Sequence, residues 1–429
     1  MEVREASVNY VRTTGYKQTE VGVIPGDWNV KPLDTVASVT SGKRLPLGQS
    51  LTGHETPHPY IRVTDMRPGT VSLTDIKFVP IEVFPAIKRY RIFKEDIFIS
   101  VAGTLGIVGK IPRELDGANL TENADRITNI TCSQDYLLHV LMSPLIQKTI
   151  DSLQTVGAQP KLALTRIRKF DIPLPPTKAE QEAIAEALSD TDTLIESLEQ
   201  LLAKKHHLKQ GAMQQLLTGK KRLPGFNGEW EVKKLGETAI LKARIGWQGL
   251  TTAEYLDSGG YYLVTGTEFK NGYIDWNSCH YVDESRYKQD KYIQLKVHDV
   301  LVTKDGTIGK VALIAELPRP ATLNSGVFVI RPVEDAFHPE FFYYLLCSNV
   351  FTEFLTQLSA GSTINHLYQK DFVSFNYRTP ATIKEQTAIA AILSDLDAEL
   401  AALEAKLAKA RGLKQGMMQE LLSGRIRLV

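Results

Sequence analysis

An internal duplication constrains the fold more than any other feature of this sequence. Residues 180–223 align without a gap with residues 385–428, and 25 of the 44 aligned positions are identical. A fainter match precedes each copy, in which Gly103–Gly106 corresponds to Gly306–Gly309. Self-similarity of this kind indicates a repeated structural unit. The chain of 429 residues therefore has the order A-B-A′-B′, with two unlike A segments and two closely similar B segments.

Each B segment is predicted to be one long helix. Thr177 with Glu180, and Thr382 with Glu385, have the T-x-x-E spacing of a capping box, in which a hydroxyl and a carboxylate accept hydrogen bonds from backbone amides at a helix start. Neither copy contains proline, and each ends near a glycine suited to the position just after a helix. A helix of this length extends about 60 Å at roughly 1.5 Å per residue.

Apolar residues in these helices recur at alternating steps of four and three, which is the spacing of a coiled coil. The first copy has one polar position, Thr191. A stripe this long is unfavourable in water, so the helices either pair with each other or each bind another chain; pairing within the chain is the simpler arrangement. The residues of this predicted seam are Ile184, Leu188, Ile195, Leu198, Leu202, Ile389, Leu393, Leu396, Leu400, Leu403 and Leu407.

Each A segment is predicted to be β-rich. Runs of β-branched and aromatic residues, bounded by Gly, Pro or Asp, indicate strands at Tyr60–Val63, Ile97–Val101, Tyr261–Val264 and Val327–Ile330. More helical stretches follow near the end of each A segment, around 136–153 and 339–358. The fold class is therefore α+β, twice. The predicted divisions are an N-terminal tail (1–20), a first domain (21–176), a central long helix (177–220), a second domain (221–381) and a C-terminal long helix (382–429).

The composition is that of a globular protein, with 43% hydrophobic and 23% charged residues. The sequence has no run of about 18 apolar residues that a membrane span needs, and its first residues are polar, so we expect a cytoplasmic protein. Its three cysteines are far apart and are expected to be reduced. The formal net charge of +1 means that any affinity for nucleic acid must come from local basic patches or from a partner.

Motifs for catalysis are mostly absent from the sequence. The segment GTLGIVGK at 103–110 lacks the first glycine and the Ser or Thr of a phosphate-binding P-loop, so it is interpreted as a tight turn between strands or as a backbone approach to DNA. His54 and His58 have no cysteine or carboxylate cluster near them in sequence, which argues against zinc. We find no methyltransferase motif either. The sequence predicts no catalytic residue, no cofactor site and no metal site in this chain.

The pattern resembles the specificity subunits of type I restriction-modification systems. The phrases GYKQTEVGVIPGDWNVKPL, YIRVTDM, GTLGIVGK, NLTENADRI and LKQGAMQQLLTGKKRLP are similar to those subunits across nearly the whole chain. The resemblance implies that each A segment is a target recognition domain for one half of a split DNA sequence. It also implies that the two long helices pair as an antiparallel coiled coil with pseudo-two-fold symmetry and set the gap between the half-sites.

The same resemblance implies partners. They are double-stranded DNA, two methyltransferase subunits and, in the full complex, two restriction or motor subunits, with no membrane. S-adenosylmethionine, ATP and Mg2+ would then be used by those partner subunits and not by this chain.

Sequence reading requires polar side chains aimed at base edges, with other basic groups on phosphate. Two sets of loop residues are predicted to lie on the DNA face. In the first domain they are Ser41, Lys43, Arg44, Arg62, Thr64, Asp65 and Arg67. In the second domain they are Lys242, Arg244, Trp247, Gln248, Thr265, Thr267, Lys304, Lys310, Asn324 and Ser325.

Two rival hypotheses come from other functional classes. One is an adaptor protein with two globular heads on a coiled coil, which would bind no specific DNA together with methyltransferase subunits. The other is a metal-dependent nuclease, suggested by the loose D…E-x-K spacing of Asp257, Glu268 and Lys270. Cleavage of DNA by the isolated chain with magnesium would support the nuclease.

Overall fold

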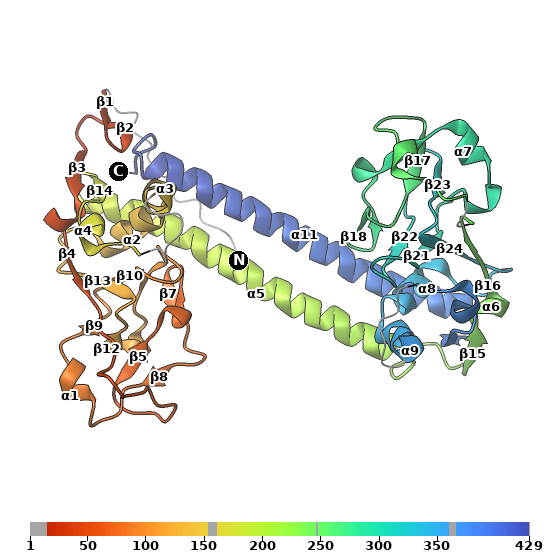
Figure 1. Ribbon diagram of the computed structural model, residues 1–429, viewed down its shortest axis with the longest axis horizontal. Helices are drawn as coiled ribbons and strands as arrows, with labels where there is room; N and C mark the ends of the chain where they lie inside the picture. The colour runs from red at the N-terminus through yellow and green to blue at the C-terminus, as the bar shows by residue number, and fades with distance from the viewer. Residues whose placement is uncertain (1–14, 153–160, 246–247, 360–365, 429) are drawn as a thin grey trace. The chain divides into compact units, whose positions relative to one another are not determined.

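The computed structural model of this protein describes residues 15–152, 161–245, 248–359 and 366–428 (Figure 1). The chain forms two compact units, of which the first comprises residues 1–199 with 406–429 and the second comprises residues 200–405. Each unit contains one β-rich domain and a length of both long helices. None of the helices in the described part of the chain has the length and apolar character that a membrane crossing requires.

The first domain is built on two four-stranded sheets. One has the order β11-β10-β13-β4 and is antiparallel throughout, and the other has the order β8-β5-β12-β9 with β5 and β12 parallel. The strands are β1 (Tyr16–Thr19), β2 (Gly22–Pro25), β3 (Asn29–Pro32), β4 (Ser38–Ser41), β5 (Pro59–Ile61), β6 (Met66–Arg67), β7 (Thr70–Val71), β8 (Lys77–Phe78), β9 (Arg91–Ile92), β10 (Ile97–Ser100), β11 (Val108–Lys110), β12 (Ala118–Leu120), β13 (Ala124–Thr128) and β14 (Asp171–Leu174). The helices are α1 (Phe84–Ile87), α2 (Gln134–Met142), α3 (Pro144–Ser152) and α4 (Leu164–Ile167).

The second domain repeats this plan. Its sheet β16-β24-β21-β22 matches β4-β13-β10-β11, and its sheet β20-β17-β23 matches β8-β5-β12, again with one parallel pair. The strands are β15 (Trp230–Lys234), β16 (Ala239–Ala243), β17 (Tyr261–Val264), β18 (Phe269–Lys270), β19 (Tyr273–Ile274), β20 (His280–Val282), β21 (Val300–Thr303), β22 (Val311–Leu313), β23 (Ala321–Leu323), β24 (Val327–Pro332) and β25 (Asn376–Pro380). The helices are α6 (Leu235–Thr238), α7 (Glu284–Lys288), α8 (Pro339–Leu346), α9 (Asn349–Ser359) and α10 (Gln369–Phe372). The duplication therefore includes the A segments, although their sequences differ.

The α+β class is confirmed, and two local expectations need correction. The run Tyr60–Val63 is extended only to Ile61, because the Asp65 carboxylate accepts a hydrogen bond from the Arg62 amide (2.8 Å) and closes a 3-10 turn. The tail predicted at 1–20 is not all tail, since β1 pairs with β2 in a hairpin. Residues 1–14 lie outside the described residues. The other predicted domain limits stay predictions.

The two long helices are α5 (Lys178–Leu216) and α11 (Ile383–Leu421), of 39 residues each. The capping threonines act as predicted, since the Glu180 amide donates to Thr177 Oγ1 (3.2 Å) and the Glu385 amide donates to Thr382 Oγ1 (3.4 Å). The glutamate half of the predicted capping box is wrong. Both carboxylates bind arginine side chains instead, because a cation is a stronger partner than a backbone amide.

These ion pairs are reciprocal. In the first unit the Arg427 guanidinium donates to both oxygens of Glu180 (2.6 Å each), and in the second unit Arg222 donates to both oxygens of Glu385 (2.6 and 2.7 Å). Both carboxylates are buried, and both arginines lie just beyond the end of the other long helix. In each unit, therefore, the start of one helix is bound to the chain that follows the other helix, and the helices run antiparallel.

A second reciprocal set lies further along the helices. Lys414 pairs with Asp192 in the first unit, and Lys209 pairs with Asp397 at the same repeat positions in the second. Several identities between the two copies thus belong to residues that pair across the helices.

The predicted seam is buried most deeply where the helices pack on a domain. Ile184 and Leu188 belong to the core of the first unit, and Ile389 and Leu393 belong to the core of the second. Of the remaining seam residues, Leu400 and Leu407 are buried, while Ile195, Leu198, Leu202, Leu396 and Leu403 are half-buried. The seam residues that pack on a domain are therefore the most completely buried, and most of the others keep partial contact with water.

Replacing Arg427 with methionine should destabilise the first unit strongly. The variant leaves the Glu180 carboxylate buried without its cation, and removal of one partner of a buried pair costs about 3 to 5 kcal/mol. Urea denaturation measures the loss. The control is Arg411→Met, which removes an exposed pair with Glu199 and should cost at most about 1 kcal/mol. Equal losses in the two variants would contradict a structural role for the buried pair.

Acidification should destabilise the first unit through His139. Its Nε2 lies 3.1 Å from Ser189 Oγ of α5, and burial lowers the pKa of His139 to about 4 from an ordinary value of 6.5. Protonation therefore favours the unfolded chain, so the stabilisation is complete above pH 6.5 and is lost as the pH falls from 6.5 toward 4, at up to about 1.4 kcal/mol per pH unit. Urea midpoints between pH 7.5 and 5 measure it. The variant His139→Gln should show a shallower pH dependence, and an unchanged dependence would rule out this histidine as the cause.

Candidate nucleic-acid interface

The glycine-containing segments between β10 and β11, and between β21 and β22, form the same tight turn. In the first, the Ser100 hydroxyl donates to the Thr104 carbonyl (2.6 Å) and accepts from the Ile107 amide (2.8 Å). Thr303 makes the corresponding bonds in the second domain. Gly103 has φ 77°, a left-handed conformation that favours glycine. The structural interpretation of this segment as a turn between strands is therefore confirmed.

The loop after β4 presents basic residues from the predicted first set. Ser41 donates to the buried Asp125 carboxylate (2.7 Å), and burial raises the pKa of that carboxyl group. Lys43 and Arg44 are exposed beyond it. These two cations are therefore available to a ligand, whereas the Ser41 hydroxyl is engaged with the domain itself.

The predicted group after β5 divides into structural and exposed residues. The Arg62 guanidinium binds the Asp65 carboxylate (2.6 Å), and Asp65 is buried. The expectation that Asp65 faces DNA is corrected, because a buried carboxylate paired with arginine holds the turn in place. Thr64 and Arg67 are exposed, and Arg67 donates to the Thr64 carbonyl (2.9 Å).

Arg244 of the second set lies in the domain core and not on the surface. Its side chain is only 1% exposed and donates to the Leu323 carbonyl (2.8 Å) and to Thr322 Oγ1 (3.2 Å). The strand registers place Gly42 at the corresponding position of the first domain, where an added Cβ would lie 2.1 Å from the Thr121 carbonyl oxygen. The two domains thus fill one structural position with a glycine and an arginine, and the DNA-facing expectation for Arg244 is corrected.

The carboxylate of Glu268 organises the loop after β17. It is 3% exposed and accepts from the hydroxyls of Thr265 and Thr267 (2.8 Å each) and from the backbone amides of Thr265 and Gly266 (3.0 Å each). The two threonine hydroxyls are therefore engaged. Glu268 has no free oxygen for a metal, while the exposed Lys270 lies near Asp275 (3.5 Å). Across the part of the chain that the structure describes, no group of three His, Cys, Asp or Glu residues could hold a metal ion.

The rest of the second set is mixed. Asn324 is buried and exchanges hydrogen bonds with both backbone groups of Leu250 (3.0 and 3.2 Å), so its expected contact with DNA is also corrected. Trp247 lies outside the described residues. The members that are exposed or partly exposed are Lys242, Gln248, Lys304, Lys310 and Ser325.

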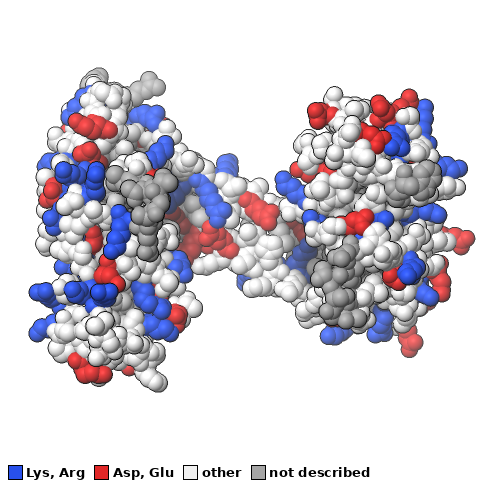
Figure 2. Space-filling view, in the orientation of Figure 1, with Lys and Arg blue, Asp and Glu red and all other residues white. Residues whose placement is uncertain are grey.

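Sequence reasoning missed three arginines of the first domain that stand beside the predicted loop. Arg89, Arg91 and Arg126 line a cavity of about 200 Å3 together with Ser41 and Gly42. Figure 2 shows Lys and Arg side chains gathered over the part of this domain where Figure 1 labels β9 and β12. The run Lys88-Arg89-Tyr90-Arg91 was a visible signal, but Arg126 reaches the site only through the sheet.

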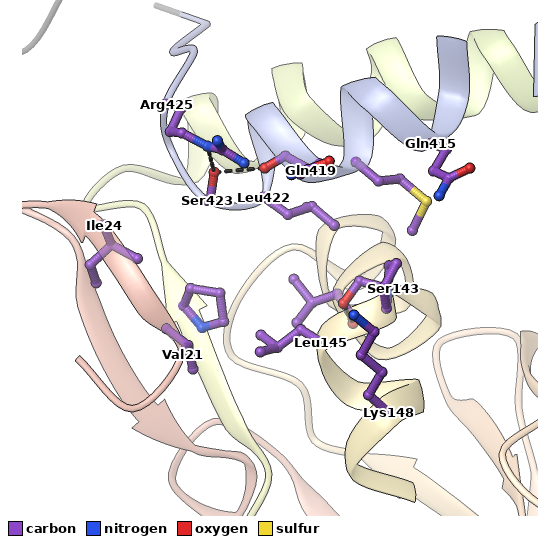
Figure 3. A pocket seen from close by; sticks show the side chains of 14 residues that line it. Val21, Ile24, Ser143, Leu145, Lys148, Gln415, Gln419, Leu422, Ser423 and Arg425 are labelled. Atoms are coloured by element: carbon purple, nitrogen blue, oxygen red, sulfur yellow. Dashed lines mark hydrogen bonds between the residues drawn. The ribbon is translucent and has the colours of Figure 1, made fainter. Parts of the chain in front are cut away.

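Each unit also has a pocket formed by a long helix and the helical part of its own domain. In the first unit this cavity of about 350 Å3 lies between the end of α11 and α3, and Figure 3 shows Gln415, Gln419, Leu145 and Lys148 around it. The second unit has a cavity of about 560 Å3 between the end of α5 and the start of α9. Gln210 and Gln214 stand there at the repeat positions of Gln415 and Gln419, so the two pockets correspond.

Comparison with known proteins follows the same duplication. The family model described as "Type I restriction modification DNA specificity domain" matches this chain twice, at residues 25–204 and 227–410. The chain is 24% identical over 450 residues to the type I restriction enzyme MjaVIII specificity subunit of Methanocaldococcus jannaschii, covering 98% of each. It is 25% identical over 302 residues to the EcoKI specificity subunit of Escherichia coli K12, covering 66% of this chain and 62% of that one.

The fold is also similar to that of a solved structure. The type I restriction-modification S subunit from M. genitalium matches with a TM-score of 0.60 and 17% identity, covering 92% of this chain and 96% of that one.

Proposed function

We propose a role for this protein from one premise: the chain belongs to the family of type I restriction-modification DNA specificity subunits. Such a subunit determines the DNA sequence on which its complex acts. We infer further that this chain reads a bipartite, asymmetric target, one half with each β-rich domain.

One observation carries this inference. The two domains share their sheet order, including the parallel pair, while the polar residues on their loops differ. A shared scaffold gives both domains the same way of approaching a duplex. Different side chains on the loops give each domain its own base contacts, so the two half-sites differ.

The chain itself is proposed to be non-catalytic. The one constellation that suggested hydrolysis fails because Glu268 is committed to its own loop. S-adenosylmethionine would serve the methyltransferase partners, and ATP with Mg2+ would serve the restriction subunits. We propose that the complex works in the cytoplasm, where the DNA that it modifies lies.

Two methyltransferase subunits and two restriction or motor subunits are proposed as partners. The corresponding pockets support a pairwise arrangement, because equivalent surfaces on a pseudo-symmetric protein bind equivalent copies of one partner. The long helices are proposed to set the gap between the half-sites. Each has 39 residues without interruption, about 58 Å at roughly 1.5 Å per residue, and is therefore suited to act as a rigid spacer.

Exchanging one domain should change one half of the target. We expect that replacing residues 21–175 with the first domain of another family member changes one half-site and leaves the other intact, because the other domain keeps its own loops. The measurement is sequencing of methylated adenines after co-expression with the methyltransferase subunit. Parallel co-expression of the unaltered chain is the control. If both half-sites changed together, or if the unaltered chain directed no specific methylation, the proposed function would be wrong.

Blocking the two pockets one at a time should remove the methyltransferase subunits one at a time. Gln415→Trp and Gln210→Trp introduce bulky side chains at exposed corresponding positions. Native mass spectrometry should find two methyltransferase subunits on the unaltered chain, one on each single variant and none on the double variant. The control Lys204→Trp lies on an exposed part of α5 outside both pockets and should still bind two. Two subunits on both single variants would show that docking occurs elsewhere.

A further inference from the structure

We propose that each β-rich domain holds one backbone phosphate of its DNA half-site in a clamp of cations around a tyrosine. In the first domain the clamp consists of Arg89 and Lys43 against the ring of Tyr90, with Arg91 beside them in the same cavity as Arg89. This inference rests on the proposed function. It assigns contacts that anchor the duplex without reading its sequence, and Arg89, Arg91 and Lys291 lie outside the two sets predicted for the DNA face.

The arginines and the tyrosine of the first clamp line a defined cavity. It lies beside the ends of β4, β9, β12 and β13 and is lined by Thr40, Ser41, Gly42, Arg89, Tyr90, Arg91, Leu120 and Arg126. The lining includes no carboxylate and no side-chain amide. A base edge presents both donors and acceptors, whereas a phosphate presents acceptors only. A cavity that offers mainly N–H and O–H donors therefore fits a phosphate better than a base.

The arginines of this cavity lack counter-charges. Among the described residues, none of Arg89, Arg91 and Arg126 forms an ion pair, although Arg62 of the same domain is paired with Asp65. Arg286 and Arg331 of the second domain are also paired with carboxylates. Three guanidinium groups around one cavity repel one another, and an anion between them would replace repulsion with charge-assisted hydrogen bonds.

Tyr90 holds two of the cations in place. The Arg89 guanidinium lies 4.9 Å from the centre of the Tyr90 ring and donates to its hydroxyl (2.7 Å), and Lys43 Nζ lies 5.9 Å from the same ring centre. Contacts of cations with a ring face orient the charges without neutralising them. The backbone next to Tyr90 is fixed as well, because the Arg126 guanidinium donates a hydrogen bond to the Arg91 carbonyl.

The second domain contains a similar group of two cations and a tyrosine, built from residues at other positions. Lys242 Nζ and Lys291 Nζ lie 5.6 and 5.3 Å from the centre of the Tyr292 ring. The two groups are built at different places in the fold, since Tyr90 directly precedes β9 whereas Tyr292 lies before β21, and Lys43 follows β4 whereas Lys242 lies in β16. Arg331 donates to the Tyr292 carbonyl (3.0 Å), so an arginine of β24 again holds the segment. The repetition of a tyrosine between two cations in unlike sequences indicates a shared task.

Salt dependence of DNA binding tests the clamp. The complex of the full chain with its methyltransferase subunits is measured on target and non-target duplexes at several salt concentrations. We expect Arg89→Ala, and separately Lys291→Ala, to weaken binding to both duplexes by the same factor. The plot of log affinity against log salt has a negative slope, and each substitution should make that slope less steep by about 0.9, the contribution of one released counterion. The methylated sequence should stay unchanged.

Matched controls remove the same charge outside the clamp. Arg113→Ala in the first domain and Lys296→Ala in the second are exposed and should leave the slope close to that of the unaltered complex. A slope for Arg89→Ala equal to that of Arg113→Ala would overturn the proposal, and so would a change in the methylated sequence, which would show that the cavity reads a base. All variants should keep the unfolding midpoint of the unaltered chain, since both clamp residues are exposed.

A free phosphate ion could bind the clamp through the same hydrogen bonds and charges as a DNA phosphate, so the two ligands must be distinguished. Titration of the full chain with inorganic phosphate should give no saturable binding at micromolar concentrations, and tight binding lost in Arg89→Ala would assign a free-anion site and overturn the DNA clamp. Failure of the proposed function is recognised separately, because it would appear as unspecific methylation by the unaltered complex.

Discussion

The buried reciprocal ion pairs are the constraint on which the rest of the structure depends. A carboxylate out of water needs a cation, and Glu180 and Glu385 each obtain theirs from the chain beyond the opposite helix. The antiparallel direction of the two helices in each unit follows from this exchange. So does the attachment of each domain, since the helix starts where the last strand of the domain ends. Each glutamate pairs with an arginine of the other copy of the repeat, so neither copy can complete its ion pair alone.

The two domains share this scaffold but differ in their loops. The differences include buried polar residues as well as exposed ones. Where the first domain has Gly42 against a backbone carbonyl, the second inserts the Arg244 side chain into its core. The side chains of Glu268 and Asn324 likewise accept hydrogen bonds from backbone amides of their loops and so stabilise the loop conformations. Loop shape is thus set by buried hydrogen bonds, and only the exposed side chains around them remain for DNA. DNA specificity in such a domain therefore depends on the buried residues that shape the loops and on the exposed side chains that the loops present.

The basic residues divide in a similar way. Some, such as Arg62 and Arg331, are neutralised by carboxylates and stabilise the fold. Others, such as Arg89 and Lys291, stand beside a tyrosine with their charge available. A chain with a net charge of only +1 can therefore attract a polyanion locally, because within the described ranges these cations are not paired with carboxylates.

The sequence by itself determined the duplication, the two long helices, the apolar seam and the α+β character of the domains, because periodicity and capping are local properties that survive without tertiary context. Of the candidate site, it identified Lys43, Arg44 and Lys242 as cations for the DNA face but could not separate these exposed residues from the buried Arg244, Asp65 and Asn324. That separation depends on which side chains a distant strand covers. Only the tertiary structure decided that Glu180 and Glu385 pair across helices and do not close capping boxes, and that Arg126 joins Arg89 at one cavity. These contacts join residues far apart in the chain, and burial, which gives each of them its strength, exists only once the sheets and helices have packed.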